Sequence, residues 1–261
     1  MKAVSRAGWL AAALLAAAAF YGCGSGSTGQ SDDGFDAGET DGFDAGADQP
    51  GDESADLDGA DGQDGGTIDG RPISPMFGWI LFNEVLIDGT AEGDPNGDGD
   101  TSHPFEDQFV ELVNVQSDAI DLEGFSIIEQ DFAEGSPRQV FPAGSSLPAG
   151  HALVVFGGGD APPATASAEF FSANANDPPG LSFGLHLSVP SDSVWLLDAQ
   201  GAVVDRFCYG SASVDCDLAA ATDASLTRSP DLTGDFVSHD QATGSNGAAF
   251  SPGTRLDGSP F

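Results

Sequence analysis

Residues 82–114 read FNEVLIDGTAEGDPNGDGDTSHPFEDQFVELVN, and this stretch decides the fold. The segments at its two ends, FNEVL and QFVELVN, are rich in Val, Leu and Phe, which is typical of β-strands. The loop between them contains DPNGDGD at residues 94–100 and is dense in carboxylates. Two strands that bracket such a loop can hold a hard cation within an all-β domain. The stretch therefore predicts β structure with an acidic, ion-binding connection.

The rest of residues 77–261 has the same character and predicts one β-sandwich domain. We expect strands, bounded by Gly, Pro, Asp or Ser, at residues 79–86, 108–114, 124–130, 152–156, 193–198 and 202–209, with shorter ones at 139–141, 186–189, 225–227 and 235–237. No segment here keeps a helical apolar period for more than a turn or two. Residues 160–180, rich in Pro, Ala and Asn, are expected to form a long loop.

The acidic loop begins with the D-x-N-x-D-G pattern of an EF-hand-like calcium loop, in which side-chain oxygens at alternate positions converge on one ion. The twelfth position, where an EF-hand carries glutamate, is Phe105 here, so the two acidic residues that follow it are substitute ligands. The candidate metal ligands are Asp94, Asn96, Asp98, Asp100, Glu106 and Asp107. We expect Ca²⁺ in a structural role, in which it neutralises carboxylates that otherwise repel one another. The alternative is an ion-free turn held by side-chain-to-backbone hydrogen bonds.

The N-terminus has a basic start and an Ala/Leu-rich apolar run at residues 8–20, which is the pattern of an export signal. A membrane-spanning helix needs ~20 apolar residues, so the run is short for that role. FYGC at residues 20–23 resembles the lipobox of bacterial lipoproteins, which implies a signal peptide of residues 1–22 and lipidation of Cys23. Gly24 is compatible with sorting to the outer membrane, on its periplasmic or cell-surface face. The alternative is ordinary signal-peptidase cleavage that leaves Cys23 in a flexible stub.

Residues 23–76 are predicted to be a disordered tether. They are rich in Gly and Asp, and from Asp32 to Asp69 they carry fourteen acidic residues and no basic one. Such a chain cannot bury enough apolar surface to offset the entropy of ordering it, and like charges extend it. We expect a spacer that holds the domain away from the membrane; weak, multivalent binding of Ca²⁺ by this segment is the other interpretation.

The charge balance excludes two classes of partner. The formal net charge is −35, and removal of Lys2 and Arg6 with the signal peptide, two positive charges, would bring it to −37 without a single lysine left. A nucleic-acid backbone or an anionic lipid surface would be repelled. We therefore expect no nucleic-acid partner, and contact with the membrane only through the N-terminal lipid.

Two cysteines, Cys208 and Cys216, remain in the folded part, in the sequence FCYGSASVDC. In an oxidising compartment they are expected to form one disulfide, which would contribute on the order of 2–3 kcal/mol by closing a short loop. The alternative is two free thiols. Their spacing is neither that of a CxxC redox site nor that of a zinc site.

Other residues that could carry chemistry have structural explanations. The histidines His103, His151, His186 and His239 do not share metal-ligand spacing, although His103 could assist the acidic loop. The sequence contains no G-x-S-x-G, HExxH or P-loop motif, and the glycines at residues 157–159 are expected to be a plain loop. Arg228 and Arg255 are expected to fix the C-terminal tail through ion pairs, and Trp195 is expected in the core.

The strand blocks occur in an order that resembles a known family. NEVL, FVELVN and IDLEGF (residues 120–125) resemble the opening of lamin-tail domains, and FPAG, LPAGHALVVF, DSVWLLDAQGAVVDRFCYG and SLTRSPD resemble the continuation in bacterial members. VPSD at residues 189–192 departs from the Asn-x-Gly-Asp turn that the family commonly shows. The resemblance implies an immunoglobulin-like β-sandwich over residues 77–261.

Together these observations predict a non-catalytic, lipid-anchored cell-envelope protein. Its calcium-stabilised sandwich would be presented to a protein or cell-surface partner whose identity the sequence does not give, or would serve a structural role in the envelope. The alternative is a secreted metal-dependent hydrolase of the nuclease or phosphoesterase type, or an accessory domain of one, because lamin-tail domains also occur fused to such enzymes.

Overall fold

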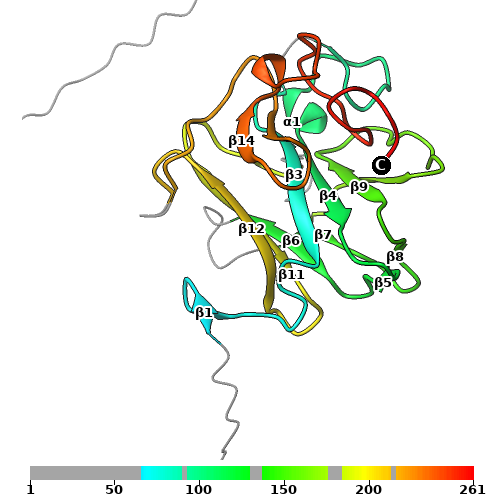
Figure 1. Cartoon of the computed structure of the whole chain (residues 1–261), viewed down its shortest axis with the longest axis vertical. Helices are drawn as coiled ribbons and strands as arrows, with labels where there is room; N and C mark the ends of the chain where they lie inside the picture. The colour runs from blue at the N-terminus through cyan, green and yellow to red at the C-terminus, as the bar shows by residue number, and fades with distance from the viewer. Residues whose placement is uncertain (1–65, 90–92, 130–136, 176–183, 213–215) are drawn as a thin grey trace, which may run out of the picture. The chain divides into compact units, whose positions relative to one another are not determined.

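The computed structural model describes residues 66–89, 93–129, 137–175, 184–212 and 216–261, which belong to one compact unit. Two antiparallel-rich sheets face each other in this part of the chain (Figure 1). The signal peptide of residues 1–22, Cys23 and most of the predicted tether lie outside the described residues. Within the described part, no helix has the length and apolar character that crossing a membrane requires.

The larger sheet has the strand order β10-β9-β4-β3-β13-β14. Its central pair is antiparallel, with Glu84 opposite Glu111, and it carries both segments with which the sequence analysis began. The strands are β3 (Ile80–Leu86), β4 (Phe109–Asn114), β9 (Ala152–Phe156), β10 (Ala168–Ser172), β13 (Leu226–Ser229) and β14 (Asp235–Ser238).

The smaller sheet has the order β12-β11-β6-β7 and is antiparallel throughout. Its strands are β6 (Ser126–Glu129), β7 (Pro137–Val140), β11 (Asp192–Leu197) and β12 (Val203–Tyr209). Short elements complete the described fold: β1 (Thr67–Ile68) with β2 (Arg71–Pro72), β5 (Ile120–Asp121) with β8 (Ser146–Leu147), the helical turn α1 (Pro104–Asp107) and the 3₁₀ turn η1 (His239–Gln241).

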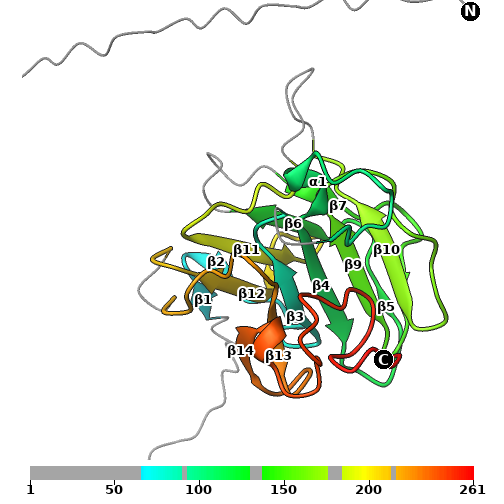
Figure 2. The ribbon, with the colours of Figure 1, turned by 90° about the horizontal axis from the view of Figure 1, so that it is seen from above.

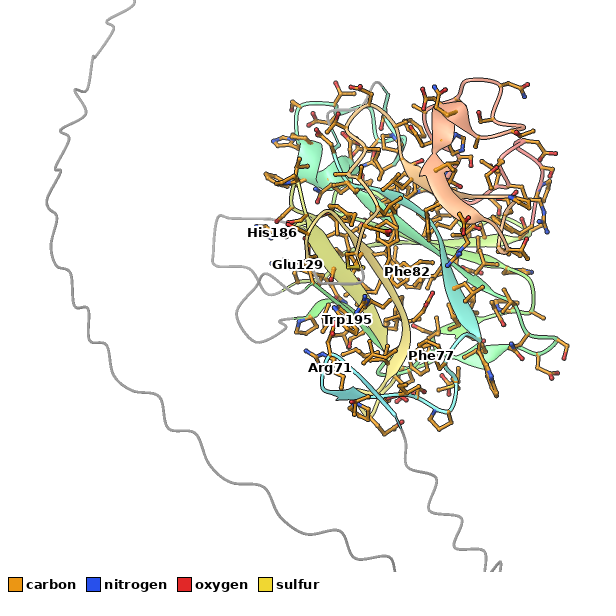
Figure 3. The ribbon with its side chains drawn as sticks, turned by 60° about the vertical axis from the view of Figure 1, so that its left-hand side comes forward. Arg71, Phe77, Phe82, Glu129, His186 and Trp195 are labelled. Carbon is orange, nitrogen blue, oxygen red and sulfur yellow. A yellow bond between two sulfur atoms is a disulfide. The ribbon has the colours of Figure 1, made fainter. Side chains whose placement is uncertain are left out.

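The main core lies between the two sheets. It is built from inward-facing Val, Leu, Ile and Phe side chains of both sheets, for example Phe82 of β3 against Phe207 of β12, with ring centroids 6.3 Å apart. Burial of such side chains contributes about 1.5–3 kcal/mol each, and it is the main force that holds the sandwich together. Trp195 of β11, labelled in Figure 3, is also buried, but in a separate cluster with Ile128, Leu197 and Val203, against which Ile68 packs. The predicted core position of Trp195 is confirmed.

The outer face of the larger sheet is covered by the C-terminal part of the chain, which runs past β3 and β4 (Figure 2). Phe250 packs against the cluster that contains Phe109 and Phe156, and Phe261 packs against the cluster of Val113, Ala152 and Ala168. This cover explains why all six residues of β4 are buried, although a strand with one solvent face normally alternates.

The all-β, immunoglobulin-like sandwich predicted from the sequence is confirmed, and the main strands lie within a few residues of their expected positions. Two expectations are wrong. Residues 186–189 form no strand, and residues 160–180 are not simply a loop, since they contain β10, which pairs in parallel with β9. In addition, residues 66–76, assigned to the tether, form the β1–β2 hairpin and hydrogen bond to β12 through Ser74.

Candidate functional site

The acidic loop is organised by its own side chains. The Oδ1 of Asp94 accepts a hydrogen bond from the Gly97 amide at 2.8 Å, and its Oδ2 accepts one from Gly99 at 2.7 Å. Asp98 Oδ1 accepts the amide of Asp100 at 2.8 Å in the same manner. Gly97 and Gly99 both have positive φ, 73° and 86°, which glycine adopts without strain. The D-x-N-x-D-G pattern therefore folds into a tight series of Asx turns.

Asp107 ends the helical turn α1 directly after this loop. Its side chain is fully buried, and neither carboxylate oxygen has a hydrogen-bond partner. Burial, as the largest cause, and then the nearby carboxylates of Asp94, Asp98, Glu106 and Asp100, in that order, together raise the pKa of Asp107 to about 6. An unpartnered buried carboxylate costs about 1–3 kcal/mol or more, so its place beside four other carboxylates requires an explanation.

The glycines at residues 157–159 hold the acidic loop and α1 against β9. Gly157 donates its amide to the carbonyl of Gln108 at 2.7 Å, and Gly158 donates to that of Glu106 at 3.2 Å. A Cβ on Gly157 would lie 1.7 Å from the Phe105 carbonyl oxygen, and one on Gly159 would lie 2.3 Å from Asp98 Oδ2. The backbone contact requires glycine at position 157, whereas Gly159 is favoured by its positive φ of 66° and by its closeness to the Asp98 side chain. These residues are a loop, as expected, but one that packs on the acidic site.

The six predicted ligands are thus neighbours in space. Asp94, Asn96, Asp98 and Asp100 form the loop, and Glu106 and Asp107 follow on α1. His103 also belongs to this group, with its Nδ1 3.2 Å from Asp100 Oδ2 and 3.9 Å from Glu106 Oε2. However, the described residues contain no group of three or more His, Cys, Asp or Glu side chains already arranged to hold a metal ion. Most loop oxygens instead accept backbone amides.

A second polar cluster, which the sequence analysis did not identify, lies beneath the C-terminal segment. Glu84 and Glu111, opposite each other on β3 and β4, are both fully buried. Burial raises the pKa of each carboxyl group, that of Glu111 well above its ordinary value, and Glu84 adds to the shift of Glu111. His239 of η1, also fully buried, lies 4.0 Å from Glu84. The signal was available in the sequence, because a glutamate stands within each of two apolar strands.

Two further groups lie elsewhere in the described fold. Cys208 and Cys216 form a disulfide, as predicted, with Cα atoms 5.5 Å apart. Glu129 Oε2 lies 3.7 Å from His186 Nδ1 (Figure 3) and 3.8 Å from the Nε of the buried Arg138, which indicates an ionic cluster in the smaller sheet. These groups hold the fold, and none lies in the acidic loop.

Arg228 and Arg255 contact the C-terminal region differently from the expectation. Arg228 donates to the carbonyls of Phe82 and Gly234 at 2.8 and 3.0 Å and lies over the Phe236 ring. Arg255 donates to the Pro260 carbonyl at 3.3 Å and lies over the ring of Phe261. Among the described residues these contacts, rather than ion pairs with aspartate, fix the two side chains.

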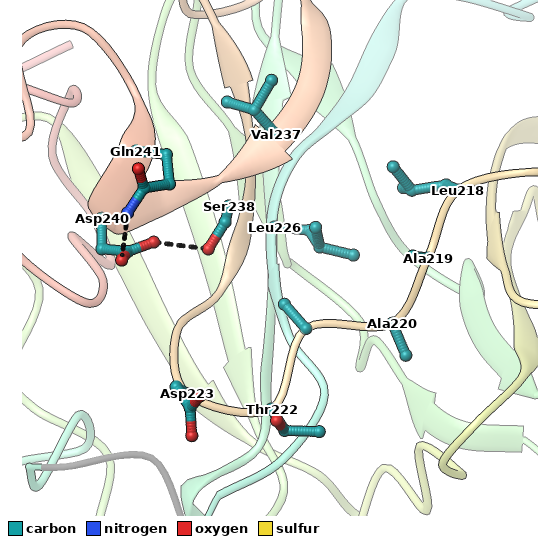
Figure 4. Close-up of a pocket in the computed structure, with 11 residues that line it drawn as sticks. Leu218, Ala219, Ala220, Thr222, Asp223, Leu226, Val237, Ser238, Asp240 and Gln241 are labelled. Carbon is teal, nitrogen blue, oxygen red and sulfur yellow. Dashed lines mark hydrogen bonds between the residues drawn. The ribbon is translucent and has the colours of Figure 1, made fainter.

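The cavity beside β14 has a volume of about 520 Å³ and is lined largely by small apolar side chains of residues 218–221, together with Leu226 and Val237 (Figure 4). Its Asp240 carboxylate is held by Ser238 and Gln241, at 2.6 Å each. The Ser238 hydroxyl and the Gln241 amide thus both donate to Asp240, while residues 218–221, Leu226 and Val237 give the cavity its apolar lining.

A family model described as Lamin Tail Domain matches residues 77–211. The chain belongs to the lamin tail domain family. The match covers more than half of the chain and includes the acidic loop, α1 and the Glu84–Glu111 pair, while the C-terminal segment lies beyond it. The resemblance noted in the sequence is thereby confirmed. A search of curated proteins found no match.

Proposed function

We propose that this lamin-tail protein is a non-catalytic, lipid-anchored module of the bacterial cell envelope whose acidic loop binds a structural Ca²⁺ ion. The family is a β-sandwich family without catalytic activity of its own, which supports an interaction role. The anchor and the outer-membrane location are supported by the sequence around Cys23 and by the acidic spacer after it. The partner is a protein or surface component that contacts the sandwich.

The main support for a bound ion is the side chain of Asp107. A fully buried carboxylate without a hydrogen-bond partner, surrounded by further carboxylates, fits a site in which a divalent cation is the missing partner. Hard oxygen donors are the ligands that Ca²⁺ prefers, and six to eight of them bind it. The residues that would hold the ion are Asp107, Glu106 and the loop residues Asp94, Asn96, Asp98 and Asp100. Bound there, the ion would offset the repulsion among these carboxylates.

The loop oxygens that accept backbone amides do not conflict with this assignment. An ionised carboxylate has about four acceptor positions, so an oxygen that caps an amide retains a lone pair for a cation. The exposed position of Asp98 and Asp100 leaves room for their side chains to turn toward Asp107. The ion would therefore join the loop, α1 and the start of β4.

Thermal unfolding of the full chain in Ca²⁺ and in EDTA tests the ion. Ligand binding to the folded state alone adds about 2.7 kcal/mol to the unfolding free energy when the ligand is at about 100 times its Kd. We expect the melting temperature to rise with Ca²⁺ concentration and the rise to disappear in Asp107→Asn. The exposed carboxylate variant Glu123→Gln is the control and should respond as the wild type does. Equal melting temperatures in Ca²⁺ and EDTA would remove the ion from the proposal.

The hydrolase alternative makes a different prediction. If the loop held a catalytic metal, Asp98→Ala would abolish turnover of nuclease or phosphodiester substrates; in the present proposal no such turnover exists and the variant only loses thermal stability.

The lipid anchor is tested separately by labelling cells with a palmitate analogue. The wild type should incorporate the label and Cys23→Ser should not.

A further inference from the structure

The C-terminal strap, residues 248–261, is held on the larger sheet by carboxylates instead of by a strand ladder. Ser251 donates its amide to Glu84 Oε1 at 2.9 Å, and Gly253 donates to Glu111 Oε2 at 2.7 Å. Leu256 donates to Asp231 Oδ2 at 3.3 Å. Two of these three acceptors are fully buried. The position of the strap therefore depends on the state of buried acids.

If each short contact around Ser251 is a hydrogen bond, either Glu84 or His239 must carry an additional proton. The Nδ1 of His239 lies 2.8 Å from the carbonyl oxygen of Ala248, which can only accept, so Nδ1 carries a hydrogen. The Ser251 Oγ lies 2.9 Å from His239 Nε2 and 2.9 Å from Glu84 Oε2. One hydroxyl proton can serve only one of these two contacts.

The second contact therefore needs a proton from Glu84 Oε2 or from His239 Nε2. In the first case Glu84 is a neutral acid that donates to Ser251, which donates to His239; in the second, His239 is a cation and Ser251 donates to the Glu84 carboxylate. The Thr254 carbonyl oxygen also lies 3.4 Å from Ser251 Oγ, but a carbonyl oxygen can only accept a hydrogen bond, so it does not supply the missing proton. Both cases contain one proton more than a carboxylate beside a neutral imidazole.

The surroundings favour retention of that proton. Glu111 faces Glu84 from β4, and Asp231 faces the cluster from the turn after β13, so two further acids lie close. Burial is the largest cause that raises the pKa of Glu84, against the opposite effects of His239 and of the serine hydrogen bonds. On the strap itself, Arg255 lies over the ring of Phe261. His239 is the one charged or chargeable basic group within ion-pair distance of Glu84 among the described residues.

We propose that Glu84, Ser251 and His239 form a proton-held latch for the C-terminal strap. The strap lies on the sheet while the three side chains share the additional proton, and it leaves the sheet when that proton is lost as the pH rises. Opening uncovers the apolar face of β4 and β9 on which Phe250 and Phe261 pack. The latch would thereby couple the local pH to exposure of this apolar face.

The direction of the pH dependence follows from the number of protons that the closed and the open state bind. Solvated glutamate and histidine side chains in general titrate near about 4.3 and 6.5, so an open state in which both groups face water holds no extra proton above about pH 7. The closed state holds one, and opening releases it. The opening equilibrium should therefore grow by up to about tenfold per pH unit above pH 7, until the closed state itself loses the proton.

Hydrogen exchange of the full-length protein tests the latch. We expect the protection factors of the Ser251 and Gly253 amides, corrected for the intrinsic exchange rate, to fall by about tenfold or more between about pH 7 and about pH 9. In Glu84→Gln the amide nitrogen donates permanently to Ser251, so this dependence should disappear, whereas Glu123→Gln should keep it. A flat profile in the wild type, or an unchanged slope in Glu84→Gln, would overturn the proposal.

A second measurement on the wild type decides the matter if the glutamine variant does not fold. The carboxyl ¹³C shift of Glu84 and the ring ¹⁵N shifts of His239 report both protonation states directly. Near pH 7.5 we expect either a neutral Glu84 or a doubly protonated His239. A carboxylate beside a neutral ring would refute the latch.

Discussion

At the residue scale, single buried acids define the chemistry of this molecule. Asp205 of β12 accepts the Phe82 amide at 2.7 Å and the Arg206 amide at 2.9 Å, and so it links the two sheets. The pKa of Asp205 is raised to about 6. Burial is the largest cause of this shift, and it outweighs the two hydrogen bonds and the charge of Arg228, which lower the pKa. The carboxyl group thus binds its proton more tightly in the folded chain than in the unfolded one.

This shift predicts a pH dependence of stability. Because the folded pKa exceeds the unfolded value, the contribution of Asp205 to the unfolding free energy is greatest below about pH 4 and falls as the pH rises through about 6, by on the order of 2–3 kcal/mol. Urea unfolding of the wild type and of Asp205→Asn at several pH values measures it. The stability of the wild type relative to the variant should decline from pH 4 to pH 7. A constant difference would contradict the prediction.

The sequence identified the residues of the acidic loop but not their arrangement. The spacing of Asp94, Asn96 and Asp98 is enough to predict a turn, and the charge density is enough to suggest an ion. The burial of Asp107 depends on the fold, because β4 begins directly after it and the glycines at residues 157–159 close over the helical turn. The Glu84–Glu111 pair was missed for a similar reason: the strap that buries it comes from the far end of the chain.

At the element scale, the loop at residues 157–159 should be sensitive to any side chain. Gly159→Ala introduces a Cβ at positive φ (66°) that would lie 2.3 Å from Asp98 Oδ2 and 2.6 Å from Asn96 Nδ2. Gly144→Ala is a matched control, with φ of 83° and nothing within 4 Å of the added atom. Both variants carry a backbone cost of about 1–2 kcal/mol. Only Gly159→Ala should lower the unfolding free energy by more than this backbone cost, and only this variant should gain less stability from Ca²⁺. Urea unfolding with and without Ca²⁺ measures both effects. Equal losses in the two variants would mean that the loop does not press on the acidic site.

Two strand predictions were wrong: a strand was predicted at residues 186–189, where none forms, and β10 was not predicted. Residues 186–189 alternate like a strand, yet the side chain of Gln108 takes the place of a partner: its Nε2 donates to the carbonyls of Ile87 and Leu187, and its Oε1 accepts the Leu187 amide. β10 was missed because its neighbours are rich in Pro and Ala, and a parallel partner such as β9 gives no hairpin signal in the sequence. Antiparallel strands with clear turns were predicted within a few residues.

At the scale of the whole molecule, one covalent link joins β12 to the segment that follows it. The Cys208–Cys216 disulfide closes a short loop next to Arg206, whose guanidinium lies 5.2 Å from the Trp195 ring centroid. Replacing both cysteines by serine should lower the unfolding free energy by about 2–3 kcal/mol. Urea unfolding of the double variant and of the wild type provides the comparison. No change in the unfolding midpoint would mean that the loop is held without the link.

In our proposals, the sandwich core provides a stable body, and the two acid clusters provide the sites that respond to Ca²⁺ and to pH. The acidic loop lies at one end of β4, and the Glu84–Glu111 pair lies at its middle. The sequence predicted the body well, because apolar strands and turns are local signals. The responses depend on burial, which a single sequence does not display.

Calorimetric titration of the full chain with Ca²⁺ tests the central claim most directly, because it separates a built site from diffuse binding by the acidic N-terminal segment. We predict one saturable site that is lost in Asp107→Asn and retained in Glu123→Gln. Only weak, unsaturable heats, or the same saturable site in Asp107→Asn, would contradict the account.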